Sequence, residues 1–133
     1  MSAERPFIVF GQPDIHKEEI TEVVDSLEKA WLGTGPKVAH FEEQFRKYEK
    51  APFAVAVSSC TAGLHLSLLA AGIGPGDEVI TTPMTFCATV NVIHHVGATP
   101  VLADVDTATM NIDPKQIEKV ITPKTKAIIP VHF

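Results

Sequence analysis

The sequence predicts a three-layer α/β fold in which a mostly parallel sheet carries helices on both faces. From residue 53 onward, short apolar runs rich in β-branched residues alternate with segments of helical spacing. A helix between successive strands is the usual connection between parallel neighbours in a sheet. The earlier part of the chain has helical spacing only. We therefore expect residues 1–52 to form an N-terminal helical segment and residues 53–133 to form the first part of an α/β domain.

The composition is typical of a globular protein with enough hydrophobic residues to form a core. The chain has 133 residues, of which 45% are hydrophobic and 20% are charged. Its net charge of -5 and its scattered lysines and arginines argue against a nucleic-acid partner. It has neither an apolar run of membrane-spanning length nor the start of a signal peptide, so we expect no membrane partner and a cytoplasmic location. The two cysteines lack metal-ligand spacing with histidine, and we expect no metal site.

Two helices are predicted in the N-terminal segment, after a lead-in that contains the apolar run at residues 7–10. Asp14 is expected to cap the first helix, which should end near Trp31. The stretch Gly33-Thr34-Gly35-Pro36 cannot continue a helix and predicts a loop. The second helix should begin at about Lys37. Apolar residues at helical spacing support the two helices, namely Ile15, Ile20, Val23, Val24 and Leu27 in the first and Val38, Phe41, Phe45 and Tyr48 in the second.

The stretch from Ala54 to Gly72 reads as a strand, a tight turn and a helix. Residues 54–57 are apolar, which predicts a short strand covered on both faces. A leucine-rich helix should follow and end at Gly72. Residues 58–61, Ser-Ser-Cys-Thr, place hydroxyls and free backbone N–H groups at the start of that helix, where a phosphate could bind. Ser59 or Thr61 could instead only cap the helix, and this stretch alone leaves both interpretations open.

The remaining chain supplies three more strands and two more helices. Strands are predicted over residues 78–81, 99–103 and 126–132, and helices over residues 85–96 and 114–121, the latter capped by Asp113. Ligands of parallel sheets bind at the carboxyl ends of the strands. Polar or aromatic groups fall at those ends in residues 58–61, 83–86 and 104–106 and at His132, which favours the phosphate interpretation. No helix follows the last strand, so we expect the chain to be a fragment of a longer protein.

Six segments of the chain, in the right order, resemble the N-terminal third of the DegT/DnrJ/EryC1/StrS family. Members are fold-type-I enzymes that use pyridoxal 5'-phosphate, mostly to convert a keto group on a nucleotide-linked sugar to an amine. The resemblance implies that the chain is part of the large domain of such a transferase. The segments are WLGTGPK (31–37), VAVSSCTA (55–62), GPGDEVI (74–80), MTFCAT (84–89), GATPV (97–101) and TPKTKAIIPVH (122–132).

The resemblance gives roles to residues already discussed. Ser59, Cys60, Thr61 and Ala62 match the family's phosphate cup, in which backbone N–H groups and a hydroxyl hold the cofactor phosphate. The family usually has glycine, sometimes alanine, where this chain has Cys60. The cysteine side chain is small, so we expect the phosphate cup to keep its structure.

Two further matches concern the cofactor ring and the substrate. Phe86 matches the aromatic residue that stacks on the pyridine ring, although its spacing alone would make it a core residue of a helix. Gly33 and Thr34 match a loop that approaches the sugar substrate.

The family's chemistry also needs groups that this chain lacks. A lysine forms a Schiff base with the cofactor, and a carboxylate keeps the pyridine nitrogen protonated. In the family both follow the part matched here, and none of the lysines present matches that position. We therefore expect no catalytic residue in this chain and no activity from it alone. Asp104 and Asp106 are better explained as turn and capping residues, and His132 as a structural histidine.

The expected function is PLP-dependent transamination by a longer enzyme, with glutamate as the expected amino donor and a homodimer as the expected assembly. Within the family the alternative is a dehydratase, in which histidine replaces the lysine and a hydroxyl group is removed. Outside it, the alternative is a non-catalytic module that binds a phosphate ligand or a partner chain. The absence of a Gly-x-Gly-x-x-Gly motif after any predicted strand argues against a nicotinamide-binding domain.

Overall fold

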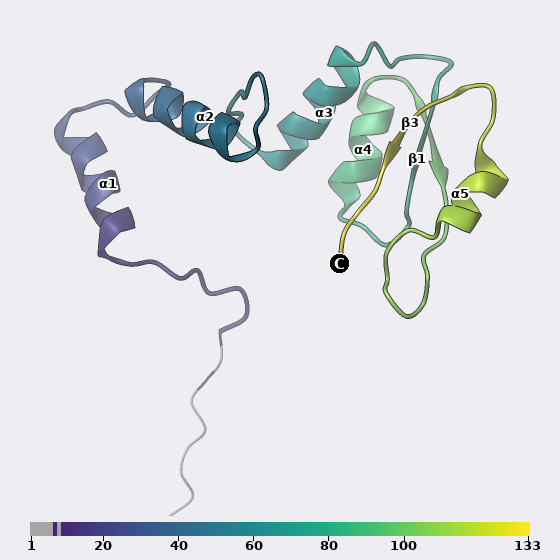
Figure 1. The fold of residues 1–133 in the computed structure, drawn as a ribbon, viewed down its shortest axis with the longest axis horizontal. Helices are drawn as coiled ribbons and strands as arrows, with labels where there is room; N and C mark the ends of the chain where they lie inside the picture. The colour runs from purple at the N-terminus through teal and green to yellow at the C-terminus, as the bar shows by residue number, and fades with distance from the viewer. Residues whose placement is uncertain (1–6, 8) are drawn as a thin grey trace, which may run out of the picture. The chain divides into compact units, whose positions relative to one another are not determined.

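The computed structural model describes residue 7 and residues 9–133, and it divides the chain into two compact units, Met1–Ala56 and Val57–Phe133. The first unit contains α1 (Lys17–Glu28) and α2 (Pro36–Tyr48) (Figure 1). Of the predicted lead-in run at residues 7–10, Ile8 lies outside the described residues. The division into an N-terminal helical segment of 52 residues and a following α/β domain stays a prediction.

The first helix begins later than the sequence predicts. Its N-cap is His16, whose backbone N–H donates a 2.7 Å hydrogen bond to the carboxylate of Glu19. The prediction that Asp14 caps α1 was wrong; its carboxylate lies 3.3 Å from the imidazole of His16. A capping box needs an acceptor three residues after the cap. Glu19 provides one for His16, whereas the residue at that distance from Asp14 is Lys17.

The second unit is built on a three-stranded sheet. Its strands are β1 (Glu78–Thr81), β2 (Thr99–Leu102) and β3 (Thr125–Ile129), all parallel and in the order β2-β1-β3. The connections contain α4 (Cys87–His95) and α5 (Pro114–Val120), and α3 (Cys60–Ala70) precedes the sheet. This confirms the predicted α/β class with a parallel sheet. Proline at the first position of α5, after the Asp113 cap, is also confirmed.

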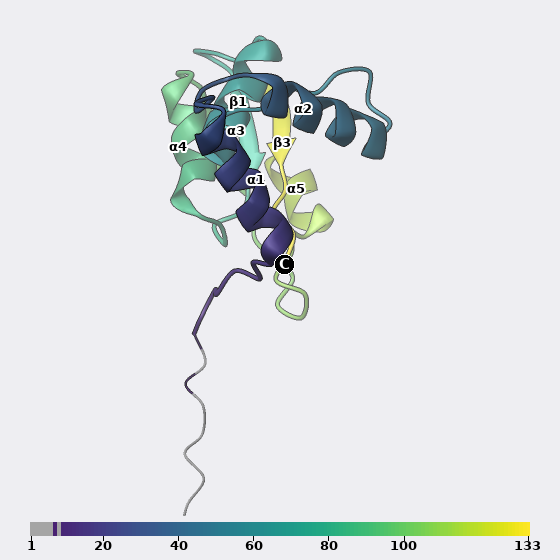
Figure 2. The ribbon, with the colours of Figure 1, turned by 90° about the vertical axis from the view of Figure 1, so that its left-hand side faces the viewer.

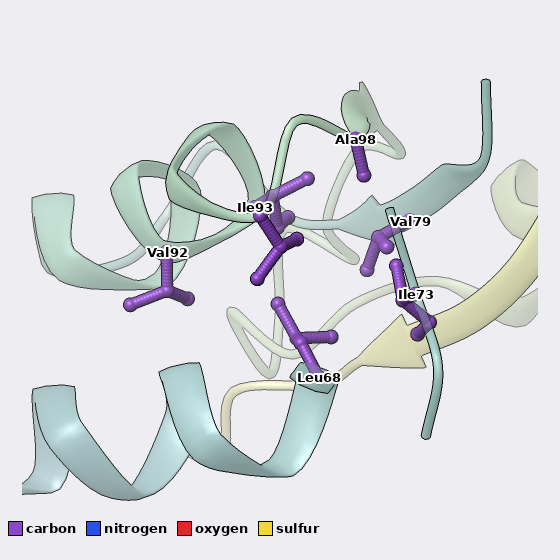
Figure 3. Packing of buried hydrophobic residues seen from close by; sticks show 7 residues of the cluster. Leu68, Ile73, Val79, Val92, Ile93 and Ala98 are labelled. Carbon is purple, nitrogen blue, oxygen red and sulfur yellow. The ribbon is translucent and has the colours of Figure 1, made fainter. Parts of the chain in front are cut away.

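The central strand β1 is buried on both faces. Val79 and Ile80, whose side chains alternate across the sheet, are both 0% exposed. On the Val79 face lies the main apolar core, to which α3 contributes Leu68 and α4 contributes Val92 and Ile93 (Figure 3). Figures 1 and 2 show α4 and α5 on opposite sides of the strands. The predicted covering of both faces by helices is therefore present.

The predicted strand at residues 54–57 is not formed. No described residue pairs with this stretch as a strand, and Val55 is 79% exposed. The prediction of a strand covered on both faces was therefore wrong. An apolar β-branched run becomes a strand only where a neighbouring strand accepts its N–H and C=O groups. Within the described residues, β1 already pairs with β2 on one side and β3 on the other.

Two other elements are shorter than predicted, for local reasons. Helix α4 begins at Cys87 because Phe86 is its N-cap and has an extended backbone, with ψ of 141°. Strand β3 ends at Ile129, immediately before Pro130, which has no N–H to donate to a ladder. In the described part of the chain, none of the helices combines the length and the apolar character that a membrane span needs.

Candidate functional site

The start of α3 is held by Ser59. This residue is the N-cap, and its hydroxyl oxygen accepts a 3.1 Å hydrogen bond from the backbone N–H of Ala62. Its carbonyl oxygen accepts a second bond of 3.1 Å from the N–H of Gly63. The capping role left open by the sequence is therefore present.

Capping by Ser59 leaves the first two amides of α3 available. The N–H groups of Cys60 and Thr61 precede the first intrahelical bonds, and no described residue accepts a hydrogen bond from them. Both residues are exposed, so the thiol of Cys60 is not buried under the turn. Two amide donors, the positive end of the helix dipole and the Thr61 hydroxyl form a local environment that suits a phosphate.

Phe86 lies at the start of the neighbouring helix. Because β1 and β2 are parallel neighbours joined through α4, this helix must begin at the carboxyl end of β1. The ring of Phe86 is 77% exposed and contributes nothing to the core. The core role that its spacing suggests is therefore excluded, and a flat apolar face is free for a ligand. Figure 1 shows α3 and α4 side by side, with their starts toward the same side of the sheet.

The loop that follows β2 is organised by its own aspartates. The carboxylate of Asp106 accepts hydrogen bonds from the amides of Thr109 (2.9 Å) and Ala108 (3.0 Å), which hold the pKa of Asp106 below its usual value. The carboxylate of Asp104 accepts from the N–H of Val105 at 2.9 Å. Both aspartates therefore stabilise the turn, as predicted. His132, after β3, is exposed.

Gly33 and Thr34 lie in the first unit, within a loop organised by Trp31. The indole Nε1 of Trp31 donates a 3.0 Å hydrogen bond to the carbonyl oxygen of Thr34. Trp31, Gly33, Gly35 and Pro36 line a cavity of about 170 Å³ together with Asp25, Ser26, Lys29 and Lys37. The structure thus brings the predicted cup and Phe86 into one unit and the predicted substrate loop into the other.

Two residues that support these loops were missed by the sequence analysis. Trp31 was interpreted as the end of a helix and as part of the WLGTGPK segment, and its side chain was given no role, although it is the only tryptophan and lies close to a Gly-Thr-Gly run. The sequence analysis gave no role to Glu42. Its carboxylate accepts a 2.8 Å hydrogen bond from the backbone N–H of Ala56. No periodicity of the sequence could have revealed a bond between residues 14 positions apart.

Comparison with known proteins agrees with this arrangement. The family model described as the DegT/DnrJ/EryC1/StrS aminotransferase family matches residues 13–133. The chain belongs to this family. The resemblance drawn from the six sequence segments is thereby confirmed, and the fold matches solved members of the same kind.

The DegT/DnrJ/EryC1/StrS relatives include proteins of bacteria and archaea. The spore coat polysaccharide biosynthesis protein SpsC of Bacillus subtilis is 58% identical over 127 residues, which are 96% of this chain and 33% of SpsC. The uncharacterized protein MJ1066 of Methanocaldococcus jannaschii is 56% identical over 92% of this chain and 32% of its own length. The chain therefore spans about a third of the length of these relatives.

Solved structures of similar proteins share the fold of this chain. A Streptococcus pneumoniae protein, named as a sugar aminotransferase and solved in its PMP form, has 48% identity and a TM-score of 0.86. That match covers 92% of this chain and 31% of the other. The aminotransferase from Psychrobacter cryohalolentis has 39% identity and a TM-score of 0.87, over 96% of this chain and 32% of the other. The S. pneumoniae protein is also known in a PLP form.

Proposed function

We propose that the protein containing this chain is a PLP-dependent aminotransferase that converts a nucleotide-linked keto sugar to an amino sugar. Membership of an aminotransferase family and likeness to proteins solved with PLP or PMP support this activity. Similarity to a spore coat polysaccharide biosynthesis protein supports a sugar substrate. Glutamate is the proposed amino donor, and we place the enzyme in the cytoplasm as a homodimer.

The main support for the proposal comes from the backbone N–H groups at the start of α3. Ser59 satisfies the amide of Ala62, while the amides of Cys60 and Thr61 remain as donors for a phosphate. The donor set fits the phosphate of PLP, because a helix start offers N–H groups and favours negative charge. We assign Ser59, Cys60, Thr61 and Ala62 to this cup.

Phe86 would orient the cofactor and Gly33 and Thr34 the substrate. The exposed ring of Phe86 offers a flat surface on which a pyridine ring can stack. When bound, PLP supplies an electron sink for breaking and forming bonds at the carbon that carries the amino group. The lysine and the carboxylate that this chemistry needs are proposed to lie outside the sequence described here, so that no catalytic residue belongs to this chain.

The activity is tested with the longest protein that contains this sequence. Incubation with PLP, glutamate and a nucleotide-linked keto sugar should yield an amino sugar and an equal amount of 2-oxoglutarate, both measured by mass spectrometry. Loss of a hydroxyl group without consumption of glutamate would identify the dehydratase alternative. Binding of PLP without either product would identify a non-catalytic module.

The cup is tested separately with Ser59→Asp. Aspartate caps helices as well as serine does, but its carboxylate would repel a bound phosphate. We expect this variant to keep the stability of the unmodified protein and to lose affinity for PLP. Unchanged PLP affinity would limit Ser59 to its capping role and would contradict the proposed cup.

A further inference from the structure

The loop between α1 and α2 leaves α1 through a defined helix stop. Ala30 follows the C-cap of α1 and has a φ angle of 53°, in the left-handed region. The N–H of Trp31 donates a 3.1 Å hydrogen bond to the carbonyl oxygen of Ser26, and the N–H of Ala30 donates one of 3.0 Å to that of Leu27. This pair of bonds is the Schellman motif, which ends a helix at a fixed residue. The first end of the loop therefore has a set direction.

The other end of the loop is tied back to α1 by Lys37. This lysine is the second residue of α2. Its ammonium group lies 2.6 Å from a carboxylate oxygen of Glu22 and 3.0 Å from one of Asp25. Glu22 lies at the middle of α1 and Asp25 in its last turn. We call these three side chains the interhelix clamp, because they join the start of α2 to α1 across the loop.

The charges of the interhelix clamp lie where the helix dipoles disfavour them. A cation is unfavourable in the first turn of a helix and an anion in the last turn, yet Lys37 and Asp25 occupy these positions. Attraction between opposite charges offsets both costs. The hydrogen bond with Glu22 raises the pKa of Lys37, and hydrogen bonds from Lys29 and then Lys37 lower the pKa of Asp25, so both groups are charged at neutral pH. Their placement is explained by the contact between the helices.

The residues held between these two ends are the proposed substrate residues. Gly33 and Thr34 lie inside the loop, where the carbonyl oxygen of Thr34 accepts the 3.0 Å hydrogen bond from the indole of Trp31. Glycine has a wide choice of backbone conformations, which makes a loop of this composition costly to order. Fixing the ends of the loop reduces the entropy that it loses when it contacts a ligand.

We propose that Lys37 is a positioning residue for the substrate loop, acting through Glu22 and Asp25. This inference rests on the proposed role of Gly33 and Thr34 in binding the sugar. The interhelix clamp holds the two ends of the loop together before the sugar arrives, and a preorganised loop binds more tightly than a mobile one. All of its members belong to the first unit of the chain.

Lys29 provides a matched control. Its ammonium group pairs with the same Asp25 at 2.8 Å. These two residues are one turn apart at the end of α1, so their ion pair does not join the two helices. Lys29→Met and Lys37→Met remove the same charge and keep a similar apolar stem, but only the second breaks the interhelix clamp.

The experiment measures both substrates of the longest protein that contains this sequence, loaded with PLP. Its sugar substrate is the nucleotide-linked keto sugar that reacts in the activity test described above. Lys37→Met should raise the KM for this sugar by about two- to fivefold, the range expected from an exposed ion pair, and leave the KM for glutamate unchanged. Lys37→Arg keeps the charge and should retain the sugar KM, as should Lys29→Met. An equal rise in both KM values would show a general loss of structure and overturn the positioning role.

Removing the acids tests whether Lys37 acts through them. The double variant Glu22→Gln with Asp25→Asn keeps Lys37 but weakens the interhelix clamp, and it should raise the sugar KM as Lys37→Met does. Amide hydrogen exchange across residues 31–35, measured before sugar is added, should be faster in both variants than in Lys29→Met. An unchanged sugar KM in the double variant would show that Lys37 contacts the substrate directly and would overturn the positioning role.

The outcomes separate this inference from the function on which it rests. If the unmodified protein forms an amino sugar and Lys37→Met has the same sugar KM as Lys29→Met, the positioning role is wrong and the proposed function stands. If the unmodified protein converts no nucleotide-linked keto sugar, the proposed function is wrong and the positioning role is overturned with it.

Discussion

Trp31 and Thr34 close a tight loop between α1 and α2 through a 3.0 Å hydrogen bond from the indole Nε1 to the Thr34 carbonyl oxygen. The indole lies directly against Gly35, where an added Cβ would meet Nε1 at 1.8 Å. Position 35 therefore requires glycine, because the Trp31 side chain leaves no space for a Cβ atom there. The proposed substrate residues Gly33 and Thr34 lie inside this loop.

Replacement of Gly35 by alanine should disrupt the Trp31 loop. The methyl group cannot share space with the indole, and overpacking of this kind costs about 1–3 kcal/mol of unfolding free energy. Trp31 is the only tryptophan of the chain, so its fluorescence reports on this loop directly. We expect Gly35→Ala to shift the emission spectrum and lower the unfolding midpoint.

Gly33→Ala is the control for this change. Nothing lies within 4 Å of a Cβ built at Gly33, and its φ angle is not in the left-handed region. This variant should keep the emission spectrum of the unmodified protein. An equal spectral shift in both variants would show that the indole does not pack on Gly35 in solution.

The stability of α2 at low pH should depend on the ionisation of Glu43. Hydrogen bonds from Arg46 and then Lys47 lower the pKa of Glu43 from 4.5 to about 2. Because this pKa lies below its unfolded value, the stabilisation is fully present above pH 4.5 and is lost as the pH falls through about 2. The carboxylate is solvent-accessible, so salt should weaken the effect.

Side-chain carboxyl NMR measures this titration directly. The Glu43 resonance should titrate well below that of an isolated glutamate, and Arg46→Met should move its midpoint upward toward 4.5. A Glu43 midpoint near 4.5 in the unmodified protein would contradict the ion pair.

Two adjacent leucines of α3 should differ sharply in their contribution to stability. Leu68 is 4% exposed and packs against Val79 and Ile93, whereas Leu69 is 51% exposed. Leu68→Ala should lower the free energy of unfolding by about 2–5 kcal/mol, because it removes buried methyl groups and leaves a cavity. Leu69→Ala should cost much less. Denaturant unfolding of both variants, with equal losses as the contradicting result, tests the placement of the core.

The sequence predicted the elements whose signals are local. The Asp113-Pro114 start of α5 and the strand at residues 78–81 needed only a cap, a proline or a buried apolar run. The apparent strand at residues 54–57 failed because a strand depends on a partner that periodicity cannot supply. The first cap failed because Glu19 selects His16 over Asp14, although aspartate has the higher preference for caps.

The sequence likewise predicted those parts of the candidate site whose signals are local. The hydroxyl-rich start of α3 was visible in residues 58–61, since helix starts and phosphates select small polar residues. The contact of Glu42 with Ala56 was not visible, because it joins residues 14 positions apart. The exposure of Phe86 was also hidden. Helical spacing suggested a core residue, whereas Phe86 is the N-cap of α4, with an extended backbone and an exposed ring.

Phe86 provides a test that separates stability from ligand binding. Its ring is 77% exposed, so Phe86→Ala should change the free energy of unfolding by no more than about 0.5 kcal/mol. The same change removes the proposed stacking surface, and the affinity for PLP should fall by about two- to tenfold, since an aromatic pair contributes about 0.5–1.5 kcal/mol. Phe86→Tyr keeps a flat ring and should retain the affinity. A large loss of stability with unchanged PLP affinity would return Phe86 to the core role and remove it from the cofactor site.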